Sequence, residues 1–174
     1  MAQTGAVRPA AVAGYFYPDN LRRLKDDIGR YLADAEAPGN DGHWPKAVIA
    51  PHAGYAYSGP IAASAYALLK PAKGTANRVV LLGPSHRVAF RGLAVPSAAA
   101  FATPLGEVPI DRAAVEAIAA LPQVTELDDA HALEHSLEVH LPFLQTVLGD
   151  FSLVPLVVGD ADAEAVAEVL EALW

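Results

Sequence analysis

The sequence contains no cysteine among its 174 residues. Disulfide bonds are therefore excluded, and their absence fits a reducing compartment. The first nine residues also lack the basic start and the apolar stretch of a secretory signal peptide. On these grounds we expect a cytoplasmic protein.

Long apolar runs and an excess of positive charge are missing as well. No run approaches the roughly 20 apolar residues that a membrane-spanning helix needs. The 12 lysines and arginines are outnumbered by 20 acidic residues, which gives a formal net charge of −8. Because a nucleic-acid binder usually carries a basic stripe, we expect neither nucleic acid nor a membrane as a partner. A metal ion or a cationic ligand suits this charge better.

Motifs for nucleotide and ester chemistry are also absent. The sequence has no Gly-x-Gly-x-x-Gly motif and no phosphate-binding Gly-Lys-Ser/Thr loop. Ser85 stands next to His86, but the surrounding residues do not form the Gly-x-Ser-x-Gly elbow of α/β hydrolases. Nucleotide chemistry is therefore not supported, and a hydrolase would have to depend on Ser85.

The length is that of one ordinary domain, and we expect residues 1–174 to form a single one. Short apolar runs predict buried strands at Ala47–Ala50, Arg78–Leu82 and Leu153–Val158. Helical spacing predicts helices at Asn20–Ala35, Ile61–Leu69, Arg112–Ala120, Leu133–Leu148 and Ala163–Leu173. Strands that alternate with helices indicate an α/β fold with a mostly parallel sheet flanked by helices.

Local signals set some of the boundaries. Pro60 suits the first position of the second helix, and Asp111 can cap the third. Helix 133–148 should start or bend near Pro142, because proline is awkward in a helix interior. Two shorter strands, 92–100 and 102–110, should join near Thr103–Gly106, and residues 37–44 have the composition of a loop.

Two histidines follow two of the predicted strands. His52 comes just after Ala47–Ala50, and His86 lies four residues beyond Leu82. Ligands of open α/β sheets bind beyond the carboxyl ends of the strands. The spacing of neighbouring strands, near 5 Å, could bring both imidazoles to one ion. Since neutral imidazole suits iron, copper, zinc and nickel, this pair favours a metal site over two unrelated packed histidines.

The ten residues after the first predicted strand, 51–60, are rich in special side chains. Two glycines permit tight backbone turns, and two tyrosines offer apolar rings with hydroxyl tips beside His52. This density favours a functional loop over a plain connector. We expect Tyr57 to help shape a pocket there.

A third cluster runs from His131 to His140. His131 and His135 are four apart, as are Glu134 and Glu138, so each pair shares a face if the segment is helical. The zincin pattern is not met, because no glutamate directly follows the first histidine. We predict that His135 acts as an acid or base near the metal, since imidazole titrates close to neutrality. Structural ion pairing and a solvated helix face are expected to account for Glu138 and His140, with His140 outside the cleft.

Taken together, five segments resemble the MEMO family, known in microbial genomes as AmmeMemoRadiSam system protein B. The segments are Ala11–Pro18, Pro51–Gly59, Gly83–His86, Thr103–Gly106 and Glu134–Gln145. They occur in the family's order and extend over almost the whole chain. The set is far more specific than any one motif in it.

The resemblance implies a fold like that of class III extradiol dioxygenases, which hold non-haem iron at their strand ends. It implies that His52 and His86 are metal ligands for iron or copper, with divalent iron favoured, and that His135 is an active-site histidine. His131 fits a position where microbial members often have histidine, so it is a second catalytic candidate beside Tyr57. The family's radical-SAM and Amme-type proteins are the partners that the resemblance implies.

Two functions remain open from the sequence. One is metal-dependent redox or oxygen chemistry of the dioxygenase type. The other is a non-catalytic module that binds a peptide or small molecule in the same cleft, since fold does not fix function.

The sequence departs from the family pattern at its end. Members continue beyond the last helix predicted here, to a Ser-Ser-Asp-x-Ser-His-like strand end and a cysteine that completes the metal site. This sequence ends at Trp174, whereas a βα repeat normally leads on to another strand. We therefore expect a chain that lacks the C-terminal part and binds metal weakly.

Overall fold

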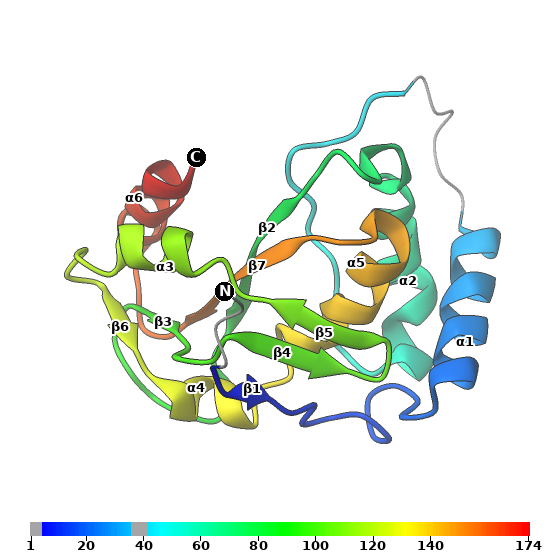
Figure 1. Cartoon of the computed structure of the whole chain (residues 1–174), viewed down its shortest axis with the longest axis horizontal. Coiled ribbons are helices and arrows are strands. Elements are labelled where there is room, and N and C mark those ends of the chain that lie inside the picture. Colours follow the sequence, from blue (N-terminus) through cyan, green and yellow to red (C-terminus); the bar gives the residue numbers. More distant parts are fainter. Residues whose placement is uncertain (1–4, 36–41) are drawn as a thin grey trace.

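The fold is built on two small sheets (Figure 1). The structure is a computed structural model, and it describes residues 5–35 and 42–174. The strands are β1 (Val7–Arg8), β2 (Arg78–Pro84), β3 (Leu93–Val95), β4 (Ala100–Thr103), β5 (Gly106–Pro109), β6 (Val124–Glu126) and β7 (Ser152–Val158). The helices are α1 (Leu21–Asp34), α2 (Tyr55–Ala67), α3 (Arg112–Ile118), α4 (Asp128–Ala132), α5 (Leu141–Leu148) and α6 (Ala163–Leu173), with 3-10 turns η1 (Lys70–Ala72) and η2 (Glu138–His140). Most of the expected loop at 37–44 lies outside the described residues.

The larger sheet has the strand order β2-β7-β3-β6, and it is mixed. β2 and β7 are parallel along their whole length, as are β3 and β6, but β3 runs antiparallel to β7. Only the eight residues 85–92 separate β2 from β3. A parallel return needs a crossover of a dozen or more residues, so β3 has to run back against β2 and β7. The α/β class is confirmed, while the prediction of a mostly parallel sheet is met only in part.

The smaller sheet has the order β1-β4-β5. β4 and β5 form an antiparallel hairpin in which Thr103 pairs with Gly106, so the expected junction at these residues is confirmed. The expected strand 92–100 is not continuous, because its residues are divided between β3 of the larger sheet and β4 of the smaller one. The Thr103 hydroxyl donates to the carbonyl of Gly106 at 3.0 Å and accepts from the backbone N–H of Leu105, which closes the turn. β1 adds to the free side of β4 in parallel and carries the N-terminal residues across the molecule.

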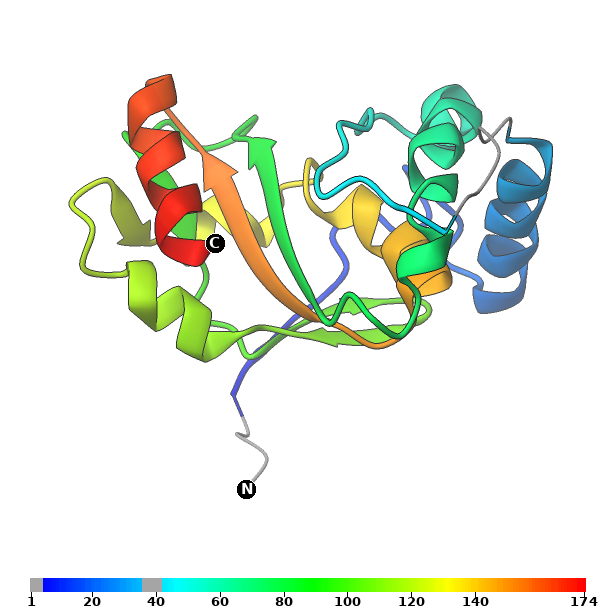
Figure 2. The same cartoon turned by 90° about the horizontal axis from the view of Figure 1, so that it is seen from above.

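Helices flank the larger sheet on both sides. α3 and α6 lie on one side of the β2–β7 pair, and α1, α2 and α5 lie on the other (Figure 2). β7 is the inner strand of this pair, and its residues Leu153, Val154, Leu156 and Val157 are fully buried. β2, at the edge of the sheet, is only partly covered. The carboxyl end of this pair therefore opens between the two helical layers.

Three of the predicted helices, α1, α3 and α6, are confirmed, and so is the predicted Asp111 cap. Asn20 caps α1 by accepting from the backbone N–H of Arg23, Asp111 caps α3, and Asp162 caps α6. α2 begins at Tyr55, earlier than predicted, because its N-terminus is anchored by a hydrogen bond from the Tyr55 N–H to the carbonyl of Phe16. Pro60 therefore lies inside this helix instead of at its first position.

Two other expectations are wrong. Residues 47–50 form no strand, and Ile49 is 99% exposed. Pro45 and Pro51 flank this run, and each removes a backbone donor that a sheet would need. The expected helix does not run from residue 133, because residues 133–140 form a loop and the turn η2, but the expected start near Pro142 is confirmed: α5 begins at Leu141 with Pro142 in its first turn. Among the described residues, no helix has both the length and the apolar composition needed to cross a membrane.

Candidate metal centre

Three histidines from three separate loops converge beyond the end of β2. One ring nitrogen from each of His52, His86 and His135 can be chosen so that all three atoms lie within 4.8 Å of one another. The ring centroids of His86 and His135 are 4.4 Å apart and nearly stacked, and that of His52 lies 5.3 Å from His86. The group is open to solvent, because the His86 side chain is 39% exposed. The structure thus brings together the three histidines that sequence analysis placed at one cleft.

His52 reaches the group from the loop that leads into α2. The loop is held at its far end by the Tyr55 N–H, which donates to the carbonyl of Phe16, and by the Ser58 hydroxyl, which donates to the carbonyl of Ala53. The Tyr55 hydroxyl donates to the carbonyl of Val139 and connects this loop to η2. These bonds place His52 without the strand that was expected before it.

His86 is fixed by the carboxylate of Glu134, which is 2% exposed. One oxygen accepts from the His86 backbone N–H at 2.6 Å, and the other lies 2.9 Å from Nδ1 of the same residue. The second oxygen also accepts from the backbone N–H groups of His135 and Ser136. Burial acts to raise the pKa of Glu134, but these hydrogen bonds prevail and lower it to about 2. Glu134 is therefore ionised at neutral pH.

His135 lies in the loop between α4 and η2, which packs directly on the end of β2. The Ser136 hydroxyl donates to the carbonyl of Pro84 at 2.8 Å. A Cβ atom on Gly83 would stand 2.7 Å from that hydroxyl oxygen, so this close approach requires glycine. On its other side the His135 ring contacts the ring of Phe16, 4.6 Å away.

A second buried carboxylate, Glu138, holds the N-terminal segment against the same loop. It is fully buried and accepts from the Arg8 guanidinium, the Tyr17 hydroxyl and the backbone N–H groups of Ala11 and Val12. Arg8 also donates to two carbonyls of the histidine-bearing segment, those of residues 131 and 134. The ion pairing expected of Glu138 is confirmed by Arg8, whereas its expected place on a solvated helix face is wrong, because the segment is not a continuous helix and this side chain points inward.

The electrostatics favour neutral imidazoles at His52 and His135. Burial, followed by the proximity of His86, lowers the pKa of His52. Burial also lowers the pKa of His135, although the Glu134 carboxylate acts in the opposite direction. A neutral imidazole has a lone pair to give, whereas a protonated one has none. The group is therefore prepared to bind a cation near neutral pH.

Comparison with known proteins identifies the family of this chain. The model of the Memo-like protein family matches residues 8–174. The chain belongs to the Memo-like family. It is 41% identical over 174 residues to a MEMO1 family protein of Methanopyrus kandleri, with 95% of this chain and 61% of the relative covered. It is 38% identical to a MEMO1 family protein of Thermotoga neapolitana (94% and 62% covered) and 34% identical to one of Nitrosopumilus maritimus (94% and 60%).

This Memo-like chain spans about three fifths of the length of the curated relatives it matches. All three histidines of the group fall inside the region that the family model covers. The part of the chain that carries the three-histidine group is therefore part of the family domain.

Two residues predicted to act in the site lie apart from the three-histidine group. His131 is 2% exposed, its Nε2 lies 3.0 Å from the carbonyl oxygen of Ala94, and its ring meets that of Phe101. Tyr57 stands on the first turn of α2 with 88% of its surface exposed. The structure brings neither to the group, because the break after α4 separates His131 from His135 and α2 turns Tyr57 outward.

His140, for which no role was predicted, is buried close to the group. It is 6% exposed, so its placement on a solvated face is also wrong. Its Nδ1 lies 2.6 Å from the hydroxyl of Tyr66, and its ring centroid is 6.5 Å from that of His52. Burial lowers the pKa of His140 to about 4, so this ring is neutral as well.

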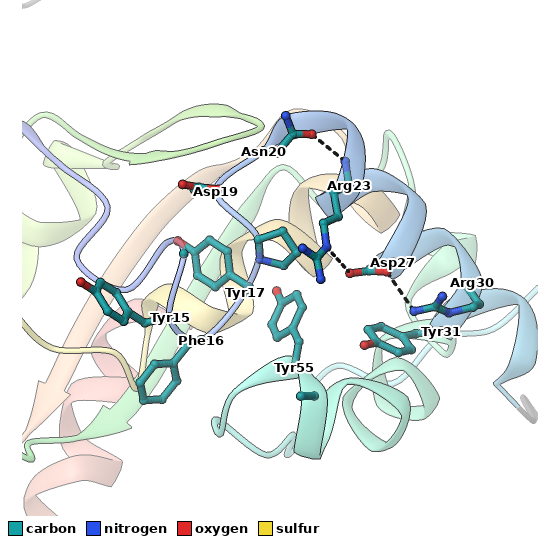
Figure 3. Close-up of a pocket in the computed structure, with 13 residues that line it drawn as sticks. Tyr15, Phe16, Tyr17, Asp19, Asn20, Arg23, Asp27, Arg30, Tyr31 and Tyr55 are labelled. Carbon is teal, nitrogen blue, oxygen red and sulfur yellow. Dashed lines mark hydrogen bonds and ion pairs between the residues drawn. The ribbon is translucent and has the colours of Figure 1, made fainter.

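A pocket of about 510 Å³ adjoins the group through Phe16. Its wall combines aromatic rings with charged side chains of α1, where Asp27 lies between the guanidinium groups of Arg23 and Arg30 (Figure 3). The ring of Phe16 both lines this pocket and packs on His135. A ligand in the pocket would thus be separated from His135 by the ring of Phe16.

The role of Glu134 in holding the histidines could have been inferred from its place in the sequence. Glu134 immediately precedes His135 in the family motif, yet the four-residue spacing pairs it with Glu138 instead. For Arg8 the sequence offers no signal, because its partners lie more than 120 residues away.

Proposed function

We propose that this chain binds one divalent transition-metal ion through His52, His86 and His135, in the cytoplasm, and that the site serves oxygen-dependent redox chemistry of the dioxygenase type. The observation that carries the proposal is the convergence of three imidazole nitrogens within 4.8 Å. In a loaded site each nitrogen lies about 2 Å from the ion, so small side-chain rotations suffice for all three to reach it.

The donor set supports iron over copper. The three side chains that converge are all imidazoles, and none of them is a thiolate that would favour Cu(I). Three imidazoles suit Fe(II), which would supply the ability to activate dioxygen when bound. Iron is also the metal that the dioxygenase-like fold implies.

The protein's own residues have definable tasks around such an ion. His52 and His135 remain unprotonated near neutrality because their pKa values are lowered by burial. Phe16 covers one face of His135 and limits the access of water from that side. His135 was expected to act as an acid or base, but its distance from His52 and His86 supports a ligand role more directly.

The neighbouring pocket supports a small organic molecule or a peptide side chain as the substrate or ligand. It is large enough for such a group and offers aromatic faces together with both signs of charge. The alternative function, a binding module without catalysis, rests on this same pocket. Radical-SAM and Amme-type proteins remain proposed partners on the strength of the family resemblance.

Anaerobic titration calorimetry with Fe(II) tests the proposal. The unmodified protein should bind one equivalent, and His52→Ala, His86→Ala and His135→Ala should each weaken binding at least tenfold. His43→Ala removes an exposed histidine outside the group and should leave binding unchanged.

The outcomes separate the candidate functions. If His135→Ala retains full affinity while the other two variants lose it, His135 is an acid or base and not a ligand. If the unmodified protein binds no divalent metal, the metal-dependent function is wrong and the binding module is the better account.

A further inference from the structure

We infer that Glu134 is a positioning residue that makes Nε2 of His86 the metal-binding atom and holds His86 and His135 at a fixed separation. Sequence analysis assigned no role to Glu134. The metal-binding part of the inference rests on the proposed function, whereas the protonation pattern of His86 can be measured without any metal.

The carboxylate of Glu134 is surrounded by donors. Oε2 accepts from the backbone N–H of His86, and Oε1 accepts from the backbone N–H groups of His135 at 2.8 Å and Ser136 at 2.9 Å. Nδ1 of His86 lies 2.9 Å from Oε1, and Nδ1 of His135 lies 3.3 Å from the same atom. Both oxygens therefore face backbone amides, which can donate a hydrogen bond but cannot accept one.

This arrangement decides which nitrogen of His86 carries the proton. Oε1 already accepts from two backbone N–H groups and Oε2 from a third, so the carboxylate is ionised and only accepts. Nδ1 of His86 must then be the donor, because two acceptors at 2.9 Å would repel each other. In the neutral ring Nε2 is left with the lone pair, and Nε2 is the atom available to a metal ion.

The same carboxylate also sets the spacing of two histidines that come from different parts of the chain. His86 follows β2, whereas His135 belongs to the loop after α4. Glu134 binds the backbone of both, and the Ser136–Pro84 hydrogen bond adds a second connection between the two loops. A carboxylate that orients a metal-binding histidine in this way typically contributes roughly 10- to 100-fold to metal affinity.

Long-range ¹H–¹⁵N correlation spectra of the metal-free protein at pH 8 test the inference directly. We expect His86 in the unmodified protein to be protonated at Nδ1 and unprotonated at Nε2. A spectrum showing the proton on Nε2 would overturn the inference, whatever the protein does with metals.

The variant Glu134→Gln tests the consequence, with Glu138→Gln as the matched control. The amide cannot satisfy all the donors, since its NH₂ group must face either the His86 backbone N–H or Nδ1 of the ring. We expect the Nε2–H form of His86 to become detectable and the affinity for Fe(II) to fall roughly 10- to 100-fold. Glu138→Gln also alters a buried carboxylate of this segment, but one without a hydrogen bond to any of the three histidines, so it should leave His86 protonated at Nδ1 even where it loosens the segment.

Three results decide between the accounts. The inference is overturned if Glu134→Gln and Glu138→Gln have the same effect on both the His86 spectrum and Fe(II) affinity. It stands, and the proposed function fails, if the unmodified protein shows the Nδ1–H form but binds no Fe(II). If Glu134→Gln does not fold, the spectrum of the unmodified protein still decides the assignment.

Discussion

At the scale of single residues, buried charge decides how the histidine-bearing segment is held. Arg8 and Glu138 are 6% and 0% exposed, and they form an ion pair whose remaining hydrogen-bonding groups are also engaged. A buried pair of this kind contributes little net stability compared with an apolar pair, but removing one partner leaves an uncompensated charge. The link between the N-terminal segment and the site therefore depends on both residues being present.

We expect Arg8→Met to lower the free energy of unfolding by about 3 kcal/mol, because Glu138 would remain buried without its cation. Urea denaturation at pH 7.5 measures this. Arg30→Met is the matched control: Arg30 is exposed in its pair with Asp27, and its loss should change the stability by no more than about 1 kcal/mol. Equal effects of the two substitutions would contradict the structural role assigned to Arg8.

The sequence predicted the grouping of His52, His86 and His135 because each stands next to a recognisable local motif. It did not predict how the group is supported. Glu134 and Glu138 share the spacing of a helix face, and that pattern cannot distinguish a solvated face from two inward-pointing carboxylates in a bent loop. Their partners lie far away in the chain, and only the tertiary structure identifies them.

At the scale of elements, the close contact between the end of β2 and the loop 133–137 positions the site. Gly83 allows this contact because a side chain there would overlap Ser136 and Leu137. The elements with strong local signals were predicted correctly: α1, α3 with its Asp111 cap, α6, β2, β7 and the junction between β4 and β5. The run 47–50 was not, because its apolar composition resembles a strand while its neighbouring prolines and lack of a pairing partner prevent one.

Gly83→Ala should destabilise the protein by about 1–3 kcal/mol, since the added methyl group forces β2 and the loop apart. Gly29→Ala gives the opposite expectation. Gly29 lies in α1, and a methyl group added to its Cα would meet no other atom within 4 Å, so alanine should stabilise the helix by about 0.5–1 kcal/mol. Thermal unfolding of both variants measures the difference, and a neutral Gly83→Ala would show that the contact tolerates more space than the structure indicates.

At the scale of the whole molecule, buried histidines make the stability depend on pH. Burial lowers the pKa of His131 and of His140 to about 4, from an ordinary value of 6.5. Between these pH values the unfolded chain binds more protons than the folded protein does. Stability is therefore complete above about pH 6.5 and falls as the pH drops towards 4.

Between pH 7 and pH 5 we expect each of these two histidines to remove roughly 2 kcal/mol of stability. His131→Gln keeps a side-chain donor for the carbonyl of Ala94 but does not titrate, so its loss between the two pH values should be about 2 kcal/mol smaller. Urea denaturation of both proteins at pH 7 and pH 5 provides the comparison. Identical pH dependence of the two proteins would contradict the claim that His131 becomes protonated in the unfolded chain, but not in the folded protein, between pH 7 and pH 5.

The claim that His52, His86 and His135 jointly hold one ion is tested most directly by X-ray absorption at the iron edge of Fe(II)-loaded protein. We predict a first shell that contains three imidazole nitrogens, falling to two in His135→Ala, with oxygen from water in the remaining positions. A first shell with fewer than three imidazoles in the unmodified protein, or one that His135→Ala leaves unchanged, would contradict the account.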